Sequence, residues 1–426
     1  MLAHKEVELA GNGGNAQLWL QVVLVSALAA PGPILRTLEI AGLPHPDFPH
    51  IVESLIFGFA IFAAATLLVW ASEVAEQMIS ATLALAVLAI IAVLPEYAVD
   101  LYFAWTAHAT PEHAQFALAN MTGANRLLIG MGWPVVFFLF YLRQRQRPRI
   151  RDLSVSEQNA VGLIFLGIAT LYSLTIPLRG HLSLLDSAVM ISLFVAYLIL
   201  SSRTPPLEEQ PLVGPAKAIA ALPKRLRWTV VVGLFAYAAG VVFASAEPFA
   251  NGLIHTGETL NVNKFVLVQW VAPLASESPE FLLAAMLALR GRASAGMTLL
   301  ISSKVNQWTL LVGSLPLAYS ISGTTLSPLH MDARQVDEVF LTAGQSLFAV
   351  AVLASLSFSF SEALLIFALF AVQLVIPYPS VRLGFGGFYI LIASLWFLNE
   401  WRVIPVLFQK ARRSLAPVPL DDPGGT

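Results

Sequence analysis

The sequence contains no cysteine, and charged residues make up only 12% of its 426 positions. The absence of cysteine excludes disulfide bonds and thiolate metal sites. The shortage of charge excludes an ordinary soluble domain, in which about 25% of residues are charged. The formal net charge of −2 gives no support for a nucleic-acid partner or an acidic substrate. The polar N-terminus is not followed by a short apolar core with a small-residue cleavage site, so we expect no cleaved signal peptide.

Hydrophobic residues make up 57% of the chain, which indicates an integral membrane protein. A helix needs about 20 apolar residues to span a bilayer. By this criterion the sequence predicts an all-α membrane fold with about twelve spans. These are residues 17–37, 51–71, 77–106, 115–141, 159–178, 184–201, 228–250, 263–289, 294–321, 335–356, 360–377 and 385–405.

The basic residues cluster in alternate loops of this plan. The clusters lie in loops 142–158 and 202–227, at Arg290 and Arg292, and in the segment after the last span. Cytoplasmic loops carry an excess of Lys and Arg. All four clusters lie on one side if both termini are cytoplasmic. We therefore expect a multi-pass protein of the plasma membrane whose partners are the lipid bilayer and inorganic cations.

A proline-rich, charged segment at residues 202–227 reads as a cytoplasmic linker between two halves. Each half holds five predicted spans. Because five is odd, the second half enters the membrane from the opposite face, which makes an inverted repeat. The predicted units are an N-terminal extra helix (1–50), a first repeat (51–201), the linker, a second repeat (228–377) and a C-terminal extra helix with a tail (378–426).

The two predicted halves carry a matched motif. Each motif is a Pro-Glu within an apolar run, followed by an Asn and, seven residues later, a Gly. The motifs are Pro95-Glu96 with Asn125 and Gly132, and Pro279-Glu280 with Asn306 and Gly313. A carboxylate inside a membrane is costly and marks a functional site. Two of them, placed alike in two halves, are typical of transporters built from repeats with interrupted helices.

The residue types in these motifs suit a cation site. Proline frees a carbonyl of the preceding helical turn, so we expect helix breaks just before Pro95 and Pro279. Carboxylate, hydroxyl and amide oxygens are ligands of hard cations such as Ca²⁺. The asparagines have an alternative role in interhelical hydrogen bonds. The predicted ion-binding residues are Glu96, Glu280, Glu277, Ser276, Asn120, Asn125 and Asn306, with Glu96 and Glu280 as the central metal ligands.

These motifs resemble those of the sodium/calcium exchanger superfamily, the cation/calcium antiporters. The resemblance implies two inverted repeats, alternating access and a shared site at Glu96 and Glu280, with no cofactor beyond the transported Na⁺, Ca²⁺ or H⁺. This sequence departs from the family pattern in both repeats. Ala92-Val93 stands where the family has Thr-Ser, Glu277 stands at a serine position, and Lys304 stands at a glycine position.

Two cationic residues, Arg126 and Lys304, fall near the middle of their predicted spans. A buried cation needs a partner, and Glu96, Glu277 and Glu280 are the expected ones. Three carboxylates against two bases leave a formal surplus of −1, which favours a proton or a monovalent ion over Ca²⁺ with several Na⁺. Arg126 and Lys304 are either counter-charges that exchange with the transported ion or fixed structural ion pairs.

Three functional hypotheses follow from these residues. The first is a secondary cation antiporter, with Na⁺/Ca²⁺, Na⁺/H⁺ and Ca²⁺/H⁺ exchange all open. The second is an intramembrane enzyme, but the sequence has no His-Glu-x-x-His or Gly-x-Ser-x-Gly motif. We therefore expect no enzyme activity. The third is a non-transporting family member whose site is closed by Lys304 and Arg126.

Overall fold

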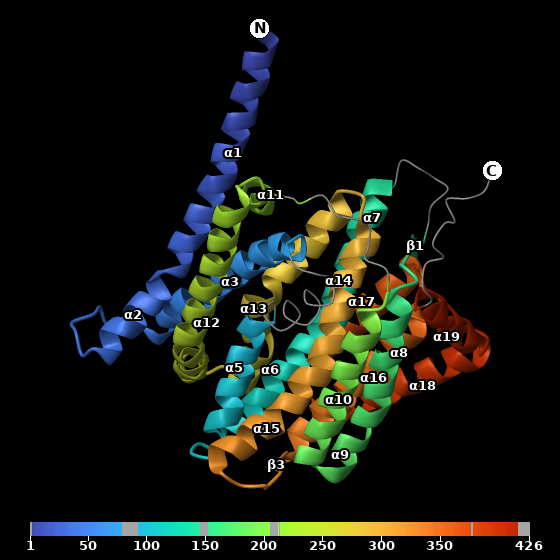
Figure 1. The fold of residues 1–426 in the computed structure, drawn as a ribbon. Coiled ribbons are helices and arrows are strands. Elements are labelled where there is room, and N and C mark those ends of the chain that lie inside the picture. Colours follow the sequence, from blue (N-terminus) through green and yellow to red (C-terminus); the bar gives the residue numbers. More distant parts are fainter. Residues whose placement is uncertain are drawn as a thin grey trace, which may run out of the picture.

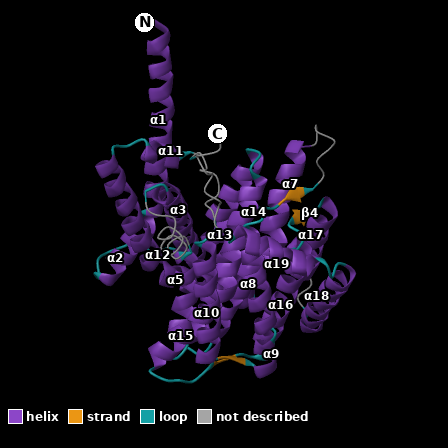
Figure 2. Ribbon diagram, turned by 45° about the vertical axis from the view of Figure 1, so that its right-hand side comes forward, coloured by secondary structure: helices purple, strands orange, loops and turns teal. Residues whose placement is uncertain are grey.

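The computed structural model describes residues 2–78, 93–144, 152–204, 212, 214–375 and 378–415. Helices dominate the described part of the chain (Figures 1 and 2). The helices are α1 (Leu2–Ala29), α2 (Pro31–Ile40), α3 (His50–Glu76), α5 (Leu94–Thr106), α6 (His113–Leu127), α7 (Trp133–Gln144), α8 (Asn159–Ser173), α9 (Thr175–Arg179), α10 (Leu184–Ser201), α11 (Pro215–Ala220), α12 (Lys224–Leu260), α13 (Lys264–Leu289), α14 (Ala293–Asn306), α15 (Val312–Gly323), α16 (Ala333–Leu353), α17 (Phe360–Val375), α18 (Pro379–Asn399) and α19 (Val403–Ser414).

Each half contains one π-helical segment, which lies within its third predicted span. η1 (Leu128–Gly132) joins α6 to α7, and η2 (Gln307–Leu311) joins α14 to α15. Such segments are rare and occur frequently at functional sites. Their matched positions, just after Asn125 and Asn306, extend the likeness between the two halves beyond the sequence motifs.

Four two-residue strands show how the halves are inverted. β1 (Leu153–Ser154) pairs antiparallel with β4 (Ser357–Phe358), and β2 (His181–Leu182) pairs antiparallel with β3 (Leu329–His330). β1 and β3 precede the fourth helix of their halves, whereas β2 and β4 precede the fifth. The two pairs lie at opposite ends of the bundle (Figure 2). Each pair thus joins the loop before the fourth helix of one half to the loop before the fifth helix of the other half. An inverted repeat requires this exchange.

The two halves interlock instead of lying apart. α3 packs on α12, α6 on α13, and α10 on α15, so segments far apart in sequence lie side by side (Figure 1). Eight described helical stretches are long and apolar enough to cross a membrane. Spans predicted at 263–289 and 294–321 coincide with α13 and with the α14–α15 stretch. The all-helical fold with two inverted five-helix repeats is confirmed.

Several predicted boundaries were wrong. The first predicted span lies within one apolar stretch, Ala16–Ile40, that is long enough to cross a membrane, although a bend at Ala30 divides it into α1 and α2. The predicted linker contains α11, and α12 begins within it at Lys224. The last span ends at Asn399, and the tail holds a separate helix, α19. Residues 79–92 of the third predicted span lie outside the described residues.

Candidate functional site

The first Pro-Glu motif begins a helix. Pro95 lies in the first turn of α5, where its missing N–H has no intrahelical partner to lose. Val93 precedes this helix as its N-cap residue, with non-helical dihedral angles. α5 thus begins at Leu94, but the segment that the predicted break would interrupt, residues 79–92, lies outside the described residues. Glu96 is held in the first turn of the helix, facing the bundle interior.

The second Pro-Glu motif does not break its helix, so that prediction was wrong. α13 continues through both Pro273 and Pro279. Proline frees the carbonyl four residues before it, so the carbonyls of Gln269 and Ala275 have no helical N–H donor. Here the Ser276 hydroxyl donates to the carbonyl of Ala272 at 3.3 Å, and the Ser278 hydroxyl donates to that of Leu274. Ser276, a predicted ion ligand, is thus bound to its own helix.

Four carboxylates gather between α5 and α13. Glu96 interacts electrostatically with Glu277, Glu280 and a residue that was not predicted, Asp100. All four are buried: Glu96 is 3% exposed, Asp100 0%, Glu277 2% and Glu280 9%. The structure therefore brings Glu96, Glu277 and Glu280 together, as expected. Asp100 lies four residues after Glu96, and this helical spacing was the signal that sequence reasoning missed.

Many polar atoms of this carboxylate cluster have no partner. Within the described residues, at least one carboxylate oxygen of each acid has no hydrogen-bond donor, and both Asp100 oxygens have none. Asn120 lies beside Asp100, and Ser303 lies beside Glu280. Buried polar groups are normally paired. These oxygens therefore form a set of unpartnered hard ligands within one buried cluster, which suits the binding of protons or hard cations.

Lys304 is the cation of this cluster. It is fully buried in α14 and interacts electrostatically with Glu277 and Glu96, as predicted. Its ammonium group donates to the Asn125 side-chain oxygen at 2.6 Å and lies 4.4 Å from the centre of the Trp308 ring. The Glu277 carboxylate also accepts from the Gln307 amide at 3.2 Å.

Both motif asparagines make contacts between the two halves. The Tyr97 hydroxyl, in the first half, donates to the Asn306 side-chain oxygen at 2.7 Å. Asn125, besides accepting from Lys304, donates to the carbonyl of Met121 at 2.8 Å. These bonds match the alternative role of interhelical hydrogen bonding.

Arg126 does not belong to this cluster, and the predicted pairing with Glu96, Glu277 or Glu280 was wrong. Its guanidinium lies 2.7 Å from the carboxylate of Glu338, which Arg382 also contacts at 3.0 Å. Arg126 points away from Asn125 because neighbouring helical residues face different directions. The formal charge of the cluster must be revised. Four carboxylates and one lysine give −3, not −1.

No three His, Cys, Asp or Glu side chains of the described residues are close enough to hold a metal ion together in this state. The carboxylates therefore cluster without forming a closed metal cage. Ca²⁺ needs six to eight oxygen ligands, so binding would require these side chains to move closer together.

Gly123, on α6 between Asn120 and Asn125, lies at a close approach to α13. A Cβ atom added there would lie 1.8 Å from the backbone oxygen of Gln269. This oxygen belongs to the residue four before Pro273, so no helical N–H bonds to it. Small residues allow membrane helices to approach closely. Gly123 thus lets α6 contact α13 beside the cluster.

Comparison with known proteins identifies the family of this chain. A sequence profile described as sodium/calcium exchanger protein matches residues 50–203 and 230–378. The chain belongs to this exchanger family. The exchanger is also similar to a solved H⁺/Ca²⁺ exchanger, CAX, with 40% identity and a TM-score of 0.88 over 94% of this chain and 99% of that one.

Two more distant structures share the fold of the exchanger. The Ca²⁺/H⁺ antiporter protein YfkE is 16% identical, with a TM-score of 0.59 over 84% of this chain and 99% of that one. The sodium-calcium exchanger NCX_Mj is 16% identical, with a TM-score of 0.50 over 77% of this chain and 97% of that one. No curated protein matched significantly.

Proposed function

We propose that this exchanger is a secondary antiporter that moves Ca²⁺ against protons. The observation that carries the proposal is the group of four buried carboxylates around one lysine. An ionised carboxylate buried without a partner is costly, so it takes up a proton or pairs with a cation. Binding of Ca²⁺ and protonation then exclude each other at the same oxygens, which couples the two ions.

The charge of the carboxylate cluster supports a divalent substrate. A formal charge of −3 can be offset by Ca²⁺ together with one proton, or by three protons. The likeness to CAX, named as an H⁺/Ca²⁺ exchanger, points to the same pair of ions. In this proposal Glu96 and Glu280, one from each half, bind either Ca²⁺ or two protons in turn, while one further proton stays on Asp100 or Glu277.

The two halves have matching roles in the proposed architecture. Residues 51–201 and 228–377 form the two repeats, a division close to the two stretches matched by the family profile. Glu96 comes from the first repeat, and Glu280 from the second. Movement of one repeat against the other would expose the shared site to each side of the membrane in turn.

The test is ion flux in proteoliposomes holding the full chain, with Ca²⁺, Na⁺ and H⁺ gradients varied independently. We expect a Ca²⁺ gradient to drive proton movement, and a Na⁺ gradient to drive neither. Glu96→Gln and Glu280→Gln should abolish exchange. Asp100→Asn should slow it by at least about tenfold, equivalent to roughly 1.4 kcal/mol. The matched control is Glu39→Gln, because Glu39 is an exposed carboxylate on α2.

Each alternative hypothesis gives a different result in this assay. Na⁺-driven Ca²⁺ movement without proton movement would identify a sodium/calcium exchanger. Na⁺-driven proton movement without Ca²⁺ would identify a Na⁺/H⁺ exchanger. No flux under any gradient, from protein that is folded and correctly inserted, would support the non-transporting hypothesis.

A further inference from the structure

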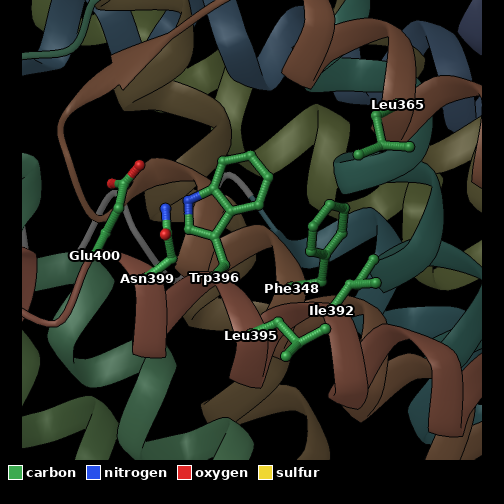
Figure 3. Close-up of a pocket in the computed structure, with 7 residues that line it drawn as sticks. All are labelled: Phe348, Leu365, Ile392, Leu395, Trp396, Asn399 and Glu400. Carbon is green, nitrogen blue, oxygen red and sulfur yellow. The ribbon is translucent and has the colours of Figure 1, made fainter.

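An apolar groove lies on the surface of the exchanger, on the C-terminal helices and not in the carboxylate cluster. Its volume is about 360 Å³. α16, α17 and α18 form its walls (Figure 3). The residues that line it are Phe348, Leu365, Ile392, Leu395, Trp396, Asn399 and Glu400. Figure 3 shows Asn399 and Glu400 together beside Trp396, whereas the aliphatic side chains lie farther along. The groove thus has an apolar body and one polar end.

The groove lies near one membrane face. Phe348 is five residues before the end of α16, and Leu365 is five residues after the start of α17. Asn399 is the last residue of α18, and Glu400 is its C-cap. These helix ends lie on the same side as the basic loops of the predicted topology. The polar end of the groove is therefore at headgroup depth, and its apolar body extends into the hydrocarbon.

The outer wall of the groove faces the surroundings of the protein. Leu395 is 55% exposed, and Leu398, on the same helix, is 73% exposed. In a bilayer, exposed apolar side chains at this depth contact lipid. The membrane therefore supplies an acyl chain as an occupant of the groove.

The polar end carries negative charge. Glu400 interacts electrostatically with Glu362, which also interacts with Asp152. The Glu362 carboxylate already accepts from the backbone N–H and hydroxyl of Ser359, both at 2.7 Å. Within the described residues, the Glu400 carboxylate has no ion-pair partner. This end would repel an anionic headgroup and attract a cationic one.

We propose that this groove binds one phospholipid with a primary-amine headgroup, of the phosphatidylethanolamine class. The acyl chain fills the apolar body between α16, α17 and α18. The ammonium group donates to Glu400 and to the side-chain oxygen of Asn399, because a primary amine has three N–H donors and a choline has none.

The experiment is native mass spectrometry of the full-length protein, released from detergent after titration with dioleoyl phosphatidylethanolamine, phosphatidylcholine or phosphatidylglycerol. We expect one phosphatidylethanolamine retained in preference to phosphatidylcholine, and phosphatidylglycerol retained least. Glu400→Gln should reduce the preference for phosphatidylethanolamine over phosphatidylglycerol about tenfold, or about 1.4 kcal/mol.

A matched pair of variants tests the groove itself. Leu395→Trp places a large side chain at the groove, whereas Leu391→Trp makes the same change one turn earlier on α18, outside the groove. Both leucines are 55% exposed, so neither change should disturb the core. We expect Leu395→Trp to lose the retained lipid and Leu391→Trp to keep it.

Three outcomes would overturn the proposal. The first is equal retention of the three lipids by the wild-type protein. The second is the same phosphatidylethanolamine retention in Leu395→Trp as in Leu391→Trp. The third is a dimer mass in the wild type that disappears only in Leu395→Trp, because the groove would then hold a second copy of the chain.

Discussion

The ammonium group of Lys304 lies 2.6 Å from the side-chain oxygen of Asn125, so a cation of the second repeat is bound to a motif residue of the first. Two predicted roles are combined in this contact. Asn125 was expected as an ion ligand, and Lys304 as a counter-charge. In this state the lysine occupies the Asn125 oxygen that was predicted to bind an ion.

Lys304→Met should raise the apparent affinity for Ca²⁺ about tenfold, or roughly 1.4 kcal/mol. Removal of the positive charge changes the formal charge of the carboxylate cluster from −3 to −4 and releases the Asn125 oxygen. Exchange should also depend less on pH, because the lysine no longer competes with the transported ion. The measurement is Ca²⁺-driven flux in proteoliposomes over a pH series.

Lys264→Met is the control for this substitution, because Lys264 pairs with Glu258 outside the carboxylate cluster. Glu280→Gln should abolish flux in the wild-type and Lys304→Met backgrounds alike. Unchanged affinity and unchanged pH dependence in Lys304→Met would leave the lysine with a purely structural role toward Asn125.

Glu338→Gln should destabilise the protein more than Arg126→Gln does. Glu338 is 1% exposed and neutralises both Arg126 and Arg382. Its loss leaves Arg126 buried without a carboxylate, which costs about 3–5 kcal/mol. Arg126→Gln instead leaves Glu338 paired with Arg382. The measurement is the temperature at which half of the protein remains monodisperse in detergent.

Arg225→Gln, at an exposed position near the start of α12, is the control for this comparison. If Glu338→Gln matched the thermal stability of Arg225→Gln, the buried ion pair would contribute nothing to the fold.

The sequence predicted the plan of the fold because that plan depends on local signals. Apolar length marks the spans, and the duplicated Pro-Glu and Asn motifs mark the repeats. Glu96 and Glu280 followed from the same duplication, and Glu277 from its position three residues before Glu280. Asp100 was within reach of the same reasoning, since it lies one helical turn after Glu96.

The ion pair of Arg126 depends on packing between distant segments. Glu338 is 212 residues from Arg126 in sequence, and no spacing rule pairs them. α13 stays continuous through Pro273 and Pro279, whereas a local proline rule predicts a break. The separate helix α19 follows the last span closely, so its start was read as part of that span.

Gly123→Ala should disrupt the packing of α6 on α13. The added Cβ would lie 1.8 Å from the Gln269 backbone oxygen, so the two helices must separate. Because Asn120 and Asn125 lie on α6, we expect loss of exchange together with poor monodispersity in detergent. Gly233→Ala and Gly240→Ala are matched controls, since a Cβ at either position would have no neighbour within 4 Å. Normal flux in Gly123→Ala would show that the close contact is not needed.

The absence of cysteine makes the topology directly testable with single introduced cysteines. Loops 142–158 and 202–227 hold the densest basic clusters, so we expect both of them, and both termini, to be cytoplasmic. Gln144→Cys and Gln210→Cys should therefore resist a membrane-impermeant thiol reagent in intact cells and react after permeabilisation. Gln210 lies outside the described residues. Ser327→Cys, near the β2–β3 pair at the opposite end of the bundle, should react in intact cells. Labelling of Gln144→Cys from outside, with protection of Ser327→Cys, would reverse the orientation of the whole exchanger.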